Sequence, residues 1–367
     1  MRLAYIANPN SIHTQRWVGY FAEQGHEVHL ISDQMPRQPL PSGIILHTLS
    51  VPVRVRGLRL LMLGRTVRRL LREIRPDLVH AHTVSPGGWL GALAGIHPLL
   101  VTAWGSDLLL TPRRSWIYSL RTRWVLRQAD YVTCVSQDLA QVARSLGADP
   151  AHLEVAPWGV DTEIFRPGPA DATLREQLGL GAGPVVLSLR AVRSLYHPLD
   201  VAQAIPQIVQ QVPEAQFVIR THACDAELLD QFQAIVHGHG VAASVHYAGS
   251  QPNDAAIADL NRLADVAVSV PESDGTPVSV LEALACGAAL VVSDLPSLRE
   301  WVQDDQQALL VPIGDIPAIS AAIVRLLSDA PLRRKLSGNG SRLILERADS
   351  RVWMRHHAEI YQRLIGH

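Results

Sequence analysis

Two carboxylates beside the start of a short helix are the residues in this sequence best placed to do chemistry. Asp274 precedes an expected helix over Val278–Cys286, and Glu282 lies on that helix, eight residues further along. A helix start presents free backbone N–H groups and the positive end of the helix dipole, and both attract anions. Glu282 stands in an otherwise apolar run, so it needs a partner such as a ligand hydroxyl. The pattern predicts a site for an anionic ligand that carries hydroxyl groups.

The elements around this helix are those of a parallel sheet. Short apolar runs at Val266–Val270 and Ala288–Val292 are typical of buried parallel strands. The loop Ser273–Pro277 leads from the first run into the helix, and Gly287 suits the helix end. Ligands of α/β proteins bind where a helix start faces the carboxyl end of a strand. An ordinary strand, loop and helix with two surface acids is the alternative interpretation.

The segment DGTPVSVLEALACG resembles the donor-site signature of the retaining glycosyltransferases of family 4, also called glycosyl transferases group 1. That signature has an acidic residue, a Gly-containing loop, a Pro, and a Glu eight positions on, followed by Ala-x-Ala-Cys-Gly. Asp274 stands where the family usually has Glu. The segment WGVDTEIFRPG resembles a second family landmark, and weaker likenesses extend over nearly the whole chain.

The resemblance implies the GT-B fold, an α/β architecture of two Rossmann-like domains. Their parallel sheets would face across a cleft, and a C-terminal helix would pack back on the first domain. The length of 367 residues suits two domains of ordinary size, and the Pro-, Gly- and Ala-rich stretch Arg166–Pro184 indicates a hinge. We expect an acceptor-binding domain over 1–168, a donor-binding domain over 169–348, and the returning helix over 349–367.

The resemblance also implies a nucleoside diphosphate sugar as the donor, bound mainly by the second domain. Glu282 matches the family Glu that holds the ribose hydroxyls, and Arg190 matches the family Arg that holds the diphosphate. A guanidinium can donate to two phosphate oxygens at once. The family's lysine a few positions on is not evident, so Arg193 is the substitute; a solvated arginine is the alternative for both positions. Further donor-binding residues are expected at Gly275, Thr276, Pro277, Val278, Ser279 and Gly249.

The acceptor is expected at the first domain. Many family members have a histidine where this chain has Trp104, and that histidine commonly lies near the reacting sugar. Asp107 and His82 therefore become catalytic candidates on the acceptor side, and Asp274 is the candidate near the anomeric carbon. A histidine or aspartate at a strand end is structural as often as functional, so both interpretations stay open. The expected acceptor-side residues are His13, Gly87, Gly88 and Trp104.

The reaction that the resemblance implies is transfer of a hexosyl or related group to an acceptor hydroxyl, with retention of anomeric configuration. In the family's proposed route a leaving phosphate oxygen takes the proton, so the enzyme supplies no nucleophile. We expect no metal and no cofactor, since the sequence has no Asp-x-Asp pair in the right setting and no His/Cys cluster with ligand spacing. A nucleotide-sugar-binding or scaffold subunit without catalysis, and a nucleotide-sugar epimerase, are the alternatives.

Charge divides the chain into two unlike halves. Residues 1–170 carry 18 arginines against 12 carboxylates, and residues 171–367 carry 15 lysines and arginines against 22 carboxylates. The acidic half is unlike a nucleic-acid binder, so no nucleic-acid partner is expected. In the basic half, residues 51–75 carry eight arginines and residues 112–127 carry five, interspersed with apolar residues. This pattern fits contact with an anionic membrane, and ordinary amphipathic surface helices are the alternative.

Cysteines and the N-terminal segment bear on the location. Cys134, Cys224 and Cys286 lie far apart without metal-ligand spacing, which favours reduced thiols. The N-terminal run enters a strand directly and does not resemble a signal peptide. The expected location is cytoplasmic, with the inner face of a membrane as the alternative. The acceptor is expected to be a glycan, a lipid-linked molecule or a small molecule, and the sequence does not distinguish these classes.

Overall fold

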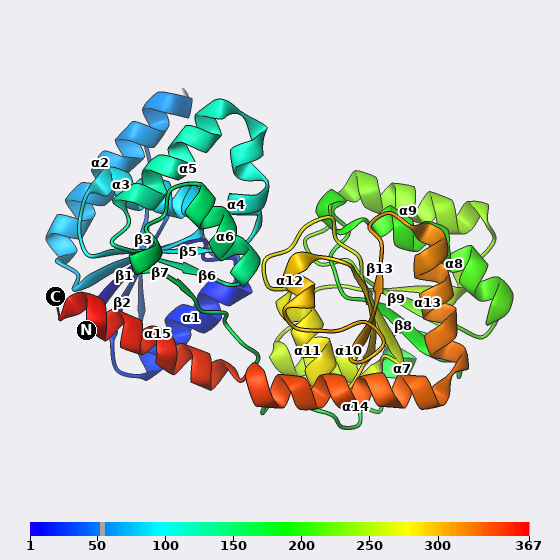
Figure 1. Cartoon of the computed structure of the whole chain (residues 1–367). Helices are drawn as coiled ribbons and strands as arrows, with labels where there is room; N and C mark the ends of the chain where they lie inside the picture. The colour runs from blue at the N-terminus through cyan, green and yellow to red at the C-terminus, as the bar shows by residue number, and fades with distance from the viewer. Residues whose placement is uncertain (52–55, 367) are drawn as a thin grey trace. The chain divides into compact units, whose positions relative to one another are not determined.

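The computed structural model describes residues 1–51 and 56–366, which form two compact units (Figure 1). Unit 1 consists of Met1–Pro157 with Trp353–His367, and unit 2 is the continuous segment Trp158–Val352. Each unit contains a parallel sheet with helices on both faces, so the expected α/β class with two Rossmann-like domains is confirmed. The chain passes from unit 1 to unit 2 at Trp158, which is earlier than the boundary after residue 168 that the sequence predicts.

Within the described residues, unit 1 is built on a seven-stranded parallel sheet. Its strands are β1 (Arg2–Ile6), β2 (Glu27–Ser32), β3 (Ile44–Thr48), β4 (Leu78–His82), β5 (Leu99–Ala103), β6 (Tyr131–Cys134) and β7 (Leu153–Val155). The strand order is β3-β2-β1-β4-β5-β6-β7, so the order reverses between β1 and β4. Such a switch point leaves a crevice at the carboxyl ends of the two strands.

Helices cover both faces of this sheet. The helical segments are α1 (Ile12–Glu23), α2 (Arg56–Ile74), η1 (Thr83–Gly88), α3 (Trp89–Ala94), α4 (Ser106–Leu109), η2 (Thr111–Arg114), α5 (Trp116–Gln128), α6 (Gln137–Ser145), η3 (Pro150–His152) and α15 (Ser350–Ile365). In Figure 1, α2, α3 and α5 lie on one face and α1 and α15 on the other. The alternation of strand side chains explains this, because Ile6 approaches Gly91 of α3 whereas Tyr5 contacts Phe21 of α1.

The C-terminal helix packs on unit 1, as the resemblance implied. Tyr361 of α15 accepts a hydrogen bond from the indole N–H of Trp17 at 2.9 Å, and its ring stacks on Phe21 with centroids 4.7 Å apart. Its hydroxyl lies 2.6 Å from Nδ1 of His80 and 3.2 Å from the hydroxyl of Tyr5. Each aromatic side chain buried here contributes about 1.5–3 kcal/mol. The returning helix is therefore held by a buried aromatic core, and this prediction is confirmed.

Unit 2 is built on a second parallel sheet, six-stranded within the described residues. Its strands are β8 (Val185–Ser188), β9 (Gln216–Arg220), β10 (Val245–Ala248), β11 (Val266–Ser269), β12 (Ala289–Ser293) and β13 (Ala308–Val311). The strand order is β10-β9-β8-β11-β12-β13, so the switch point lies between β8 and β11. The two units thus repeat one topology, and each has a crevice at the equivalent place.

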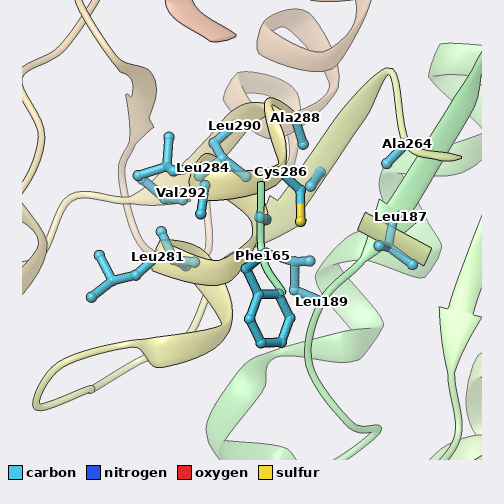
Figure 2. Close-up of a cluster of buried hydrophobic side chains, with 14 of the residues drawn as sticks. Phe165, Leu187, Leu189, Ala264, Leu281, Leu284, Cys286, Ala288, Leu290 and Val292 are labelled. Atoms are coloured by element: carbon cyan, nitrogen blue, oxygen red, sulfur yellow. The ribbon is translucent and has the colours of Figure 1, made fainter. Parts of the chain in front are cut away.

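Two apolar cores lie on the two faces of this sheet. The helical segments are α7 (Leu174–Gln177), η4 (Ser194–Tyr196), α8 (Pro198–Gln211), α9 (Ala226–Gly238), η5 (Ala242–Ser244), α10 (Asp254–Leu263), α11 (Val278–Cys286), α12 (Pro296–Arg299), α13 (Ile316–Ser328) and α14 (Ala330–Arg347). One core joins the sheet to α8, α9 and α13. Figure 2 shows the other, where Leu187 and Leu189 share a cluster with Leu281 and Leu284 of α11. This core fixes α11 against the sheet.

The first crossing of the chain between units lies earlier than composition indicates. Phe165 is fully buried in the core of unit 2 (Figure 2). The amide of Val160 donates to the carbonyl of Ala348 at 2.6 Å, and the amide of Ser350 donates back to Val160 at 2.9 Å. A Pro- and Gly-rich composition identifies an irregular segment but not the core on which it packs. The segment from Trp158 onward therefore belongs to unit 2.

The arginine-rich segment over 51–75 forms α2 from Arg56 to Ile74, and residues 52–55 of that prediction lie outside the described residues. Val67 and Leu71 are buried, whereas Leu61 is 50% exposed. The helix packs on α3, as an amphipathic helix of the outer layer does. Of the helices in the part of the chain that the structure describes, none combines the length and apolar character needed to span a bilayer.

Candidate functional site

The candidate donor site lies at the switch point of the unit 2 sheet. β8 and β11 pair as neighbours, and the helices that follow them, α8 and α11, lie on opposite faces of the sheet. Arg190 follows the carboxyl end of β8. The loop after β11 leads into α11, whose bounds are those that the sequence predicts. The fold thus brings Arg190 and this loop to one crevice.

Arg190 contacts two of the expected site residues, Asp274 and Ser279. Its Nη1 donates to Oγ of Ser279 at 3.0 Å and lies 3.0 Å from Oδ2 of Asp274. The ring of Tyr196 lies 4.0 Å from the guanidinium carbon, and the amide of Gly275 donates to Oδ1 of Asp274 at 2.9 Å. Burial opposes the charge, but Asp274 and then Tyr196 favour it, and the pKa of Arg190 is raised. The crevice therefore holds a partly buried, permanently charged guanidinium.

The start of α11 offers fewer free amides than the sequence indicates. Pro277 has no N–H, and the amide of Val278 donates to the carbonyl of Thr276 at 2.9 Å. The amide of Val280 donates to the carbonyl of Pro277 at 2.8 Å. Consequently the side chains around the helix start carry more of the expected anion binding than the backbone does.

Glu282 is buried on α11, at 5% exposure, as its apolar neighbours predict. Sequence reasoning missed two residues of this region, namely Arg220 at the end of β9, whose charge interacts with that of Glu282, and His222, which interacts with Arg220. Burial lowers the pKa of Arg220, and the charge of Glu282 opposes this. Burial, followed by the charges of Arg220, Arg193 and Arg190, lowers the pKa of His222 to about 4. The sequence signal that could have identified Arg220 is its charge at the end of the apolar run of β9.

Arg193 and Gly249 are not brought into this contact group. Arg193 is exposed, and its Nε donates to the carbonyl of Ala223 at 2.7 Å. Gly249 follows β10, which β9 separates from β8. A Cβ at Gly249 would have no atom within 4 Å, so this position is open. Neither residue has the direct link to Arg190 that Asp274 and Ser279 have.

A pocket of about 230 Å³ lies at the switch point of unit 1. The expected acceptor-side residues His82, Gly87 and Trp104 line it. Asp33 is the one carboxylate among the lining residues, and Arg59 pairs with it at 3.1 Å. Sequence reasoning missed the polar residues that follow β1, β2 and β4 and also line the pocket, namely Asn8, Ser11, Asp33, Gln34, Thr83 and Ser85.

Aromatic and imidazole rings form one wall of this pocket. The ring of Trp104 lies 6.0 Å from that of His13 and 5.3 Å from that of His82. Nδ1 of His82 is 3.3 Å from Oγ1 of Thr14, and its buried Nε2 has no hydrogen-bond partner among the described residues. Burial, and then the charge of His357, lowers the pKa of His82 to about 3. This imidazole is neutral near pH 7 and accepts protons poorly, but it can hydrogen-bond a hydroxyl.

Asp107 is enclosed by backbone amides. Its Oδ2 accepts from Val84 at 2.7 Å, and its Oδ1 accepts from Gly105 at 2.8 Å and Trp104 at 3.1 Å. Burial raises the pKa of Asp107, and these amides oppose the rise. Through these hydrogen bonds, the carboxylate of Asp107 connects the segment after β4 to the loop after β5. The contacts support a structural role for Asp107 rather than proton transfer.

Gly87 and Gly88 serve the packing of the chain on itself. A Cβ at Gly87 would lie 2.5 Å from the carbonyl oxygen of His82 and 2.8 Å from that of Ile6. A Cβ at Gly88 would lie 2.9 Å from Cγ1 of Val125. The close contacts of these glycines are therefore with neighbouring protein atoms, although Gly87 also lines the pocket.

The cysteines stay apart in the structure. Cys134, Cys224 and Cys286 are free thiols, and burial raises the pKa of Cys286 to about 12. Across residues 1–51 and 56–366, no group of three or more His, Cys, Asp and Glu side chains is placed to hold a metal ion.

Both halves of the chain match glycosyltransferase families. Residues 2–136 match the family described as "Glycosyl transferase 4-like", and residues 171–343 match "Glycosyl transferases group 1". A relative from Mycolicibacterium smegmatis, the GDP-mannose-dependent alpha-(1-6)-phosphatidylinositol monomannoside mannosyltransferase, is 29% identical over 75% of this chain and 73% of its own length. The Escherichia coli UDP-Gal:alpha-D-GlcNAc-diphosphoundecaprenol alpha-1,3-galactosyltransferase is 26% identical over 72% of this chain and 70% of its own.

Solved structures show the same architecture. The structure of Anabaena HepE in complex with UDP-glucose has a TM-score of 0.82 and 16% identity, covering 99% of this chain and 100% of that one. Sucrose-phosphate synthase from Thermosynechococcus elongatus has a TM-score of 0.83 and 18% identity, covering 100% and 99%. Given the two sheets, their switch-point crevices and the two family matches, the chain belongs to the group 1 glycosyltransferases, with a glycosyl transferase 4-like first half.

Proposed function

We propose that this chain transfers a sugar from a nucleoside diphosphate sugar to an acceptor hydroxyl, with retention of anomeric configuration and without a metal or cofactor. The contact of Arg190 with Asp274 and Ser279 carries the proposal, because it holds a partly buried cation in a crevice suited to an anion. The names of the two relatives support this donor class, since one specifies GDP-mannose and the other UDP-Gal.

Each donor-site side chain has a distinct task in this proposal. Arg190 neutralises the diphosphate, which gains charge as it leaves, so the guanidinium stabilises the transition state more than the ground state. The hydroxyl of Ser279 donates to the same phosphate oxygens. Glu282 accepts hydrogen bonds from the ribose hydroxyls with its two carboxylate oxygens. Asp274 compensates Arg190 when no ligand is bound and meets hydroxyls of the transferred sugar when the donor is present.

The leaving phosphate takes the acceptor proton in this mechanism. His82 is a poor base because its pKa is about 3, and the carboxylate of Asp107 is occupied by amides of two loops. A phosphate oxygen on the departing side of the sugar requires no protein base. Attack from that same side gives retention.

The acceptor presents a neutral, hydroxyl-bearing group to the pocket of unit 1. The pocket holds about 230 Å³, below the roughly 300–1,000 Å³ of sites for larger ligands, so it suits a single ring. The neutral imidazole of His82 and the amides of Asn8 and Gln34 are partners for hydroxyls rather than for phosphates. We propose a sugar or polyol ring of a lipid-linked glycan, and the lipid named in each relative supports this class.

A contact with an anionic membrane accompanies this acceptor. Trp116, Ile117 and Leu120 at the start of α5 are 73%, 44% and 56% exposed. Arg113 and Arg114 precede them on η2. Exposed apolar side chains beside arginines suit the interface of a bilayer that carries negative lipids. Binding to vesicles of stated composition tests this contact.

The proposal is tested by donor turnover with and without acceptor. A panel of UDP- and GDP-sugars is incubated with lipid-linked and simple alkyl glycosides, and release of nucleoside diphosphate is measured with and without EDTA. We expect release that depends on the acceptor, is insensitive to EDTA, and gives a product whose anomeric coupling constant in NMR shows retention. Glu282→Ala should weaken donor affinity at least about tenfold, because two charge-assisted hydrogen bonds are lost. Glu346→Ala, at an exposed position of α14, is the matched control.

Four outcomes would contradict the proposal. Donor binding without turnover for any acceptor would favour a nucleotide-sugar-binding subunit. Conversion of the donor without acceptor would favour an epimerase. An inverted product, or equal donor affinity in Glu282→Ala and the parent, would reject the mechanism or the ribose assignment.

A further inference from the structure

A buried arginine of unit 2 has too few partners for its charge. Arg220, the last residue of β9, is 8% exposed. Among the described residues, its one hydrogen bond runs from Nη1 to the carbonyl of Leu189 at a long 3.4 Å, and its buried Nε has none. A guanidinium removed from water is costly unless an anion at contact distance compensates it. The arrangement therefore leaves a place for an anionic ligand.

The strand register brings Arg220 next to Arg190. β9 pairs with β8 so that Ile219 lies opposite Ser188, which puts Arg220 beside the segment that leads to Arg190. Because strand side chains alternate, Arg220 follows Val218 onto the sheet face that α11 covers. Two guanidinium groups therefore end neighbouring strands at the crevice of the switch point.

The nearby charges do not fully offset the burial of Arg220. Burial lowers the pKa of Arg220, the charge of Arg190 lowers it further, and the charge of Glu282 opposes both effects. Asp274 pairs with Arg190 at 3.0 Å, so Glu282 is the carboxylate whose charge acts on Arg220. A phosphate group would add negative charge beside Arg220 and satisfy its unpaired donor.

We propose that Arg220 binds the phosphate groups of a nucleoside diphosphate, as the second cation of the site beside Arg190. The assignment rests on the proposed function and identifies a residue for the charge that the missing family lysine leaves unfilled. Arg193 is less well placed, since it is exposed and its Nε donates to Ala223. The unpaired Nε of Arg220 and a neighbouring Nη form the fork that fits two phosphate oxygens.

Ligands that share a base but differ in phosphate number test the assignment. Calorimetry measures the Kd of uridine, UMP and UDP, and of guanosine, GMP and GDP, for the parent and for Arg220→Met. We expect the Kd of the diphosphate that the parent binds to rise about tenfold to a hundredfold, the loss typical of a hydrogen bond to a charged group. The Kd of the nucleoside should change less than about twofold. Arg220→Lys keeps the charge without the fork and should show an intermediate loss.

Thermal unfolding distinguishes ligand binding from a structural role. Methionine removes a poorly compensated buried charge at similar length, so the Tm of ligand-free Arg220→Met should equal or exceed that of the parent. The rise in Tm on adding the diphosphate should shrink with the affinity. Arg334→Met, at an exposed position of α14, makes the same change in net charge and should keep every Kd at the parent value.

The outcomes separate this assignment from the proposed function. An unchanged diphosphate Kd in Arg220→Met, or equal weakening of nucleoside and diphosphate, overturns the role of Arg220. A lower ligand-free Tm with loss of all ligands overturns it too, and assigns Arg220 to holding Glu282 in place. If the parent binds neither diphosphate, the proposed function fails with it.

Discussion

The two switch points of this chain share a topology and differ in chemistry. In unit 1, β1 and β4 end at a pocket walled by neutral imidazole, indole and amide groups. In unit 2, β8 and β11 end at Arg190, Asp274 and the start of α11. One crevice suits hydroxyl groups and the other suits an anion. The repeated fold therefore fixes where ligands bind, while the few residues that follow each strand decide which ligand is bound.

The largest expected effect is the loss of diphosphate affinity when the charge of Arg190 is removed from unit 2. Arg190→Met should raise the Kd of the nucleoside diphosphate more than about a hundredfold, because a guanidinium that donates to charged oxygens loses about 1.5–3 kcal/mol per bond. It also leaves Asp274 buried at 12% side-chain exposure without its cation, so stability should fall as well. Calorimetry and thermal unfolding measure the two effects.

The double variant Arg190→Met, Asp274→Asn is the control for this prediction. It removes the stranded carboxylate and should recover most of the lost stability without recovering affinity. Recovery of diphosphate binding in the double variant would show that Arg190 serves Asp274 rather than the phosphate. Arg190 would then not be the residue that makes the unit 2 crevice suit an anion, and the contrast with the unit 1 pocket would fail.

Protonation of the buried histidines should destabilise unit 1. Burial first, and then neighbouring histidines, lowers the pKa of His80 well below its usual value and those of His82 and His357 to about 3. The unfolded chain binds protons at these positions below about pH 6.5, whereas the folded unit does not. The free energy of unfolding should therefore fall as pH drops from about 6.5 towards 4.5, by up to about 1.4 kcal/mol per pH unit for each histidine.

Urea unfolding at a series of pH values measures this slope. His357→Leu should reduce it by up to about 1.4 kcal/mol per pH unit, whatever it does to stability at pH 7.5. His237→Leu, at an exposed position of α9, should leave the slope unchanged. An unaltered slope in His357→Leu would mean that this imidazole is not buried in its neutral form.

The smallest expected effect concerns the surface of unit 1. Trp116→Ala should reduce sedimentation with vesicles of phosphatidylglycerol about tenfold, because an exposed indole that enters the interface contributes about 1–2 kcal/mol. Vesicles of phosphatidylcholine alone should bind both proteins weakly, since they lack the charge that attracts arginine. Leu345→Ala removes a similarly exposed apolar side chain from unit 2 and should bind like the parent. Equal binding of Trp116→Ala and the parent would place any membrane contact elsewhere.

Elements with a strong local pattern could be predicted from the sequence. The apolar runs predicted at Val266–Val270 and Ala288–Val292 form strands whose ends lie within one residue of the predicted bounds, and Val278–Cys286 forms the predicted helix. Each is defined by residues close in the chain, such as the glycine at φ 85° that ends α11. The boundary near Phe165 depends on a partner far along the chain, so composition alone misplaces it.

The site residues differ in the same way, because some are defined by a local pattern and others depend on distant parts of the chain. Arg190, Asp274, Ser279 and Glu282 follow from one contiguous signature and one strand end, and the structure brings the first three into contact. Arg220 escapes sequence reasoning because its importance depends on β9 pairing beside β8. The pocket residues that follow β1 and β2 escape it for the same reason, since they become neighbours of His82 only when the sheet forms.

The aromatic attachment of α15 has a consequence for how the chain is made. Trp17, His80 and Tyr5 precede unit 2 in the chain, but their partner Tyr361 follows it and is synthesised after the whole of unit 2. Unit 2 is a continuous segment and can therefore complete its core while the first unit still waits for its final helix. Cleavage of the chain before Trp353 should thus destabilise unit 1, although the cut lies beyond the core of unit 2.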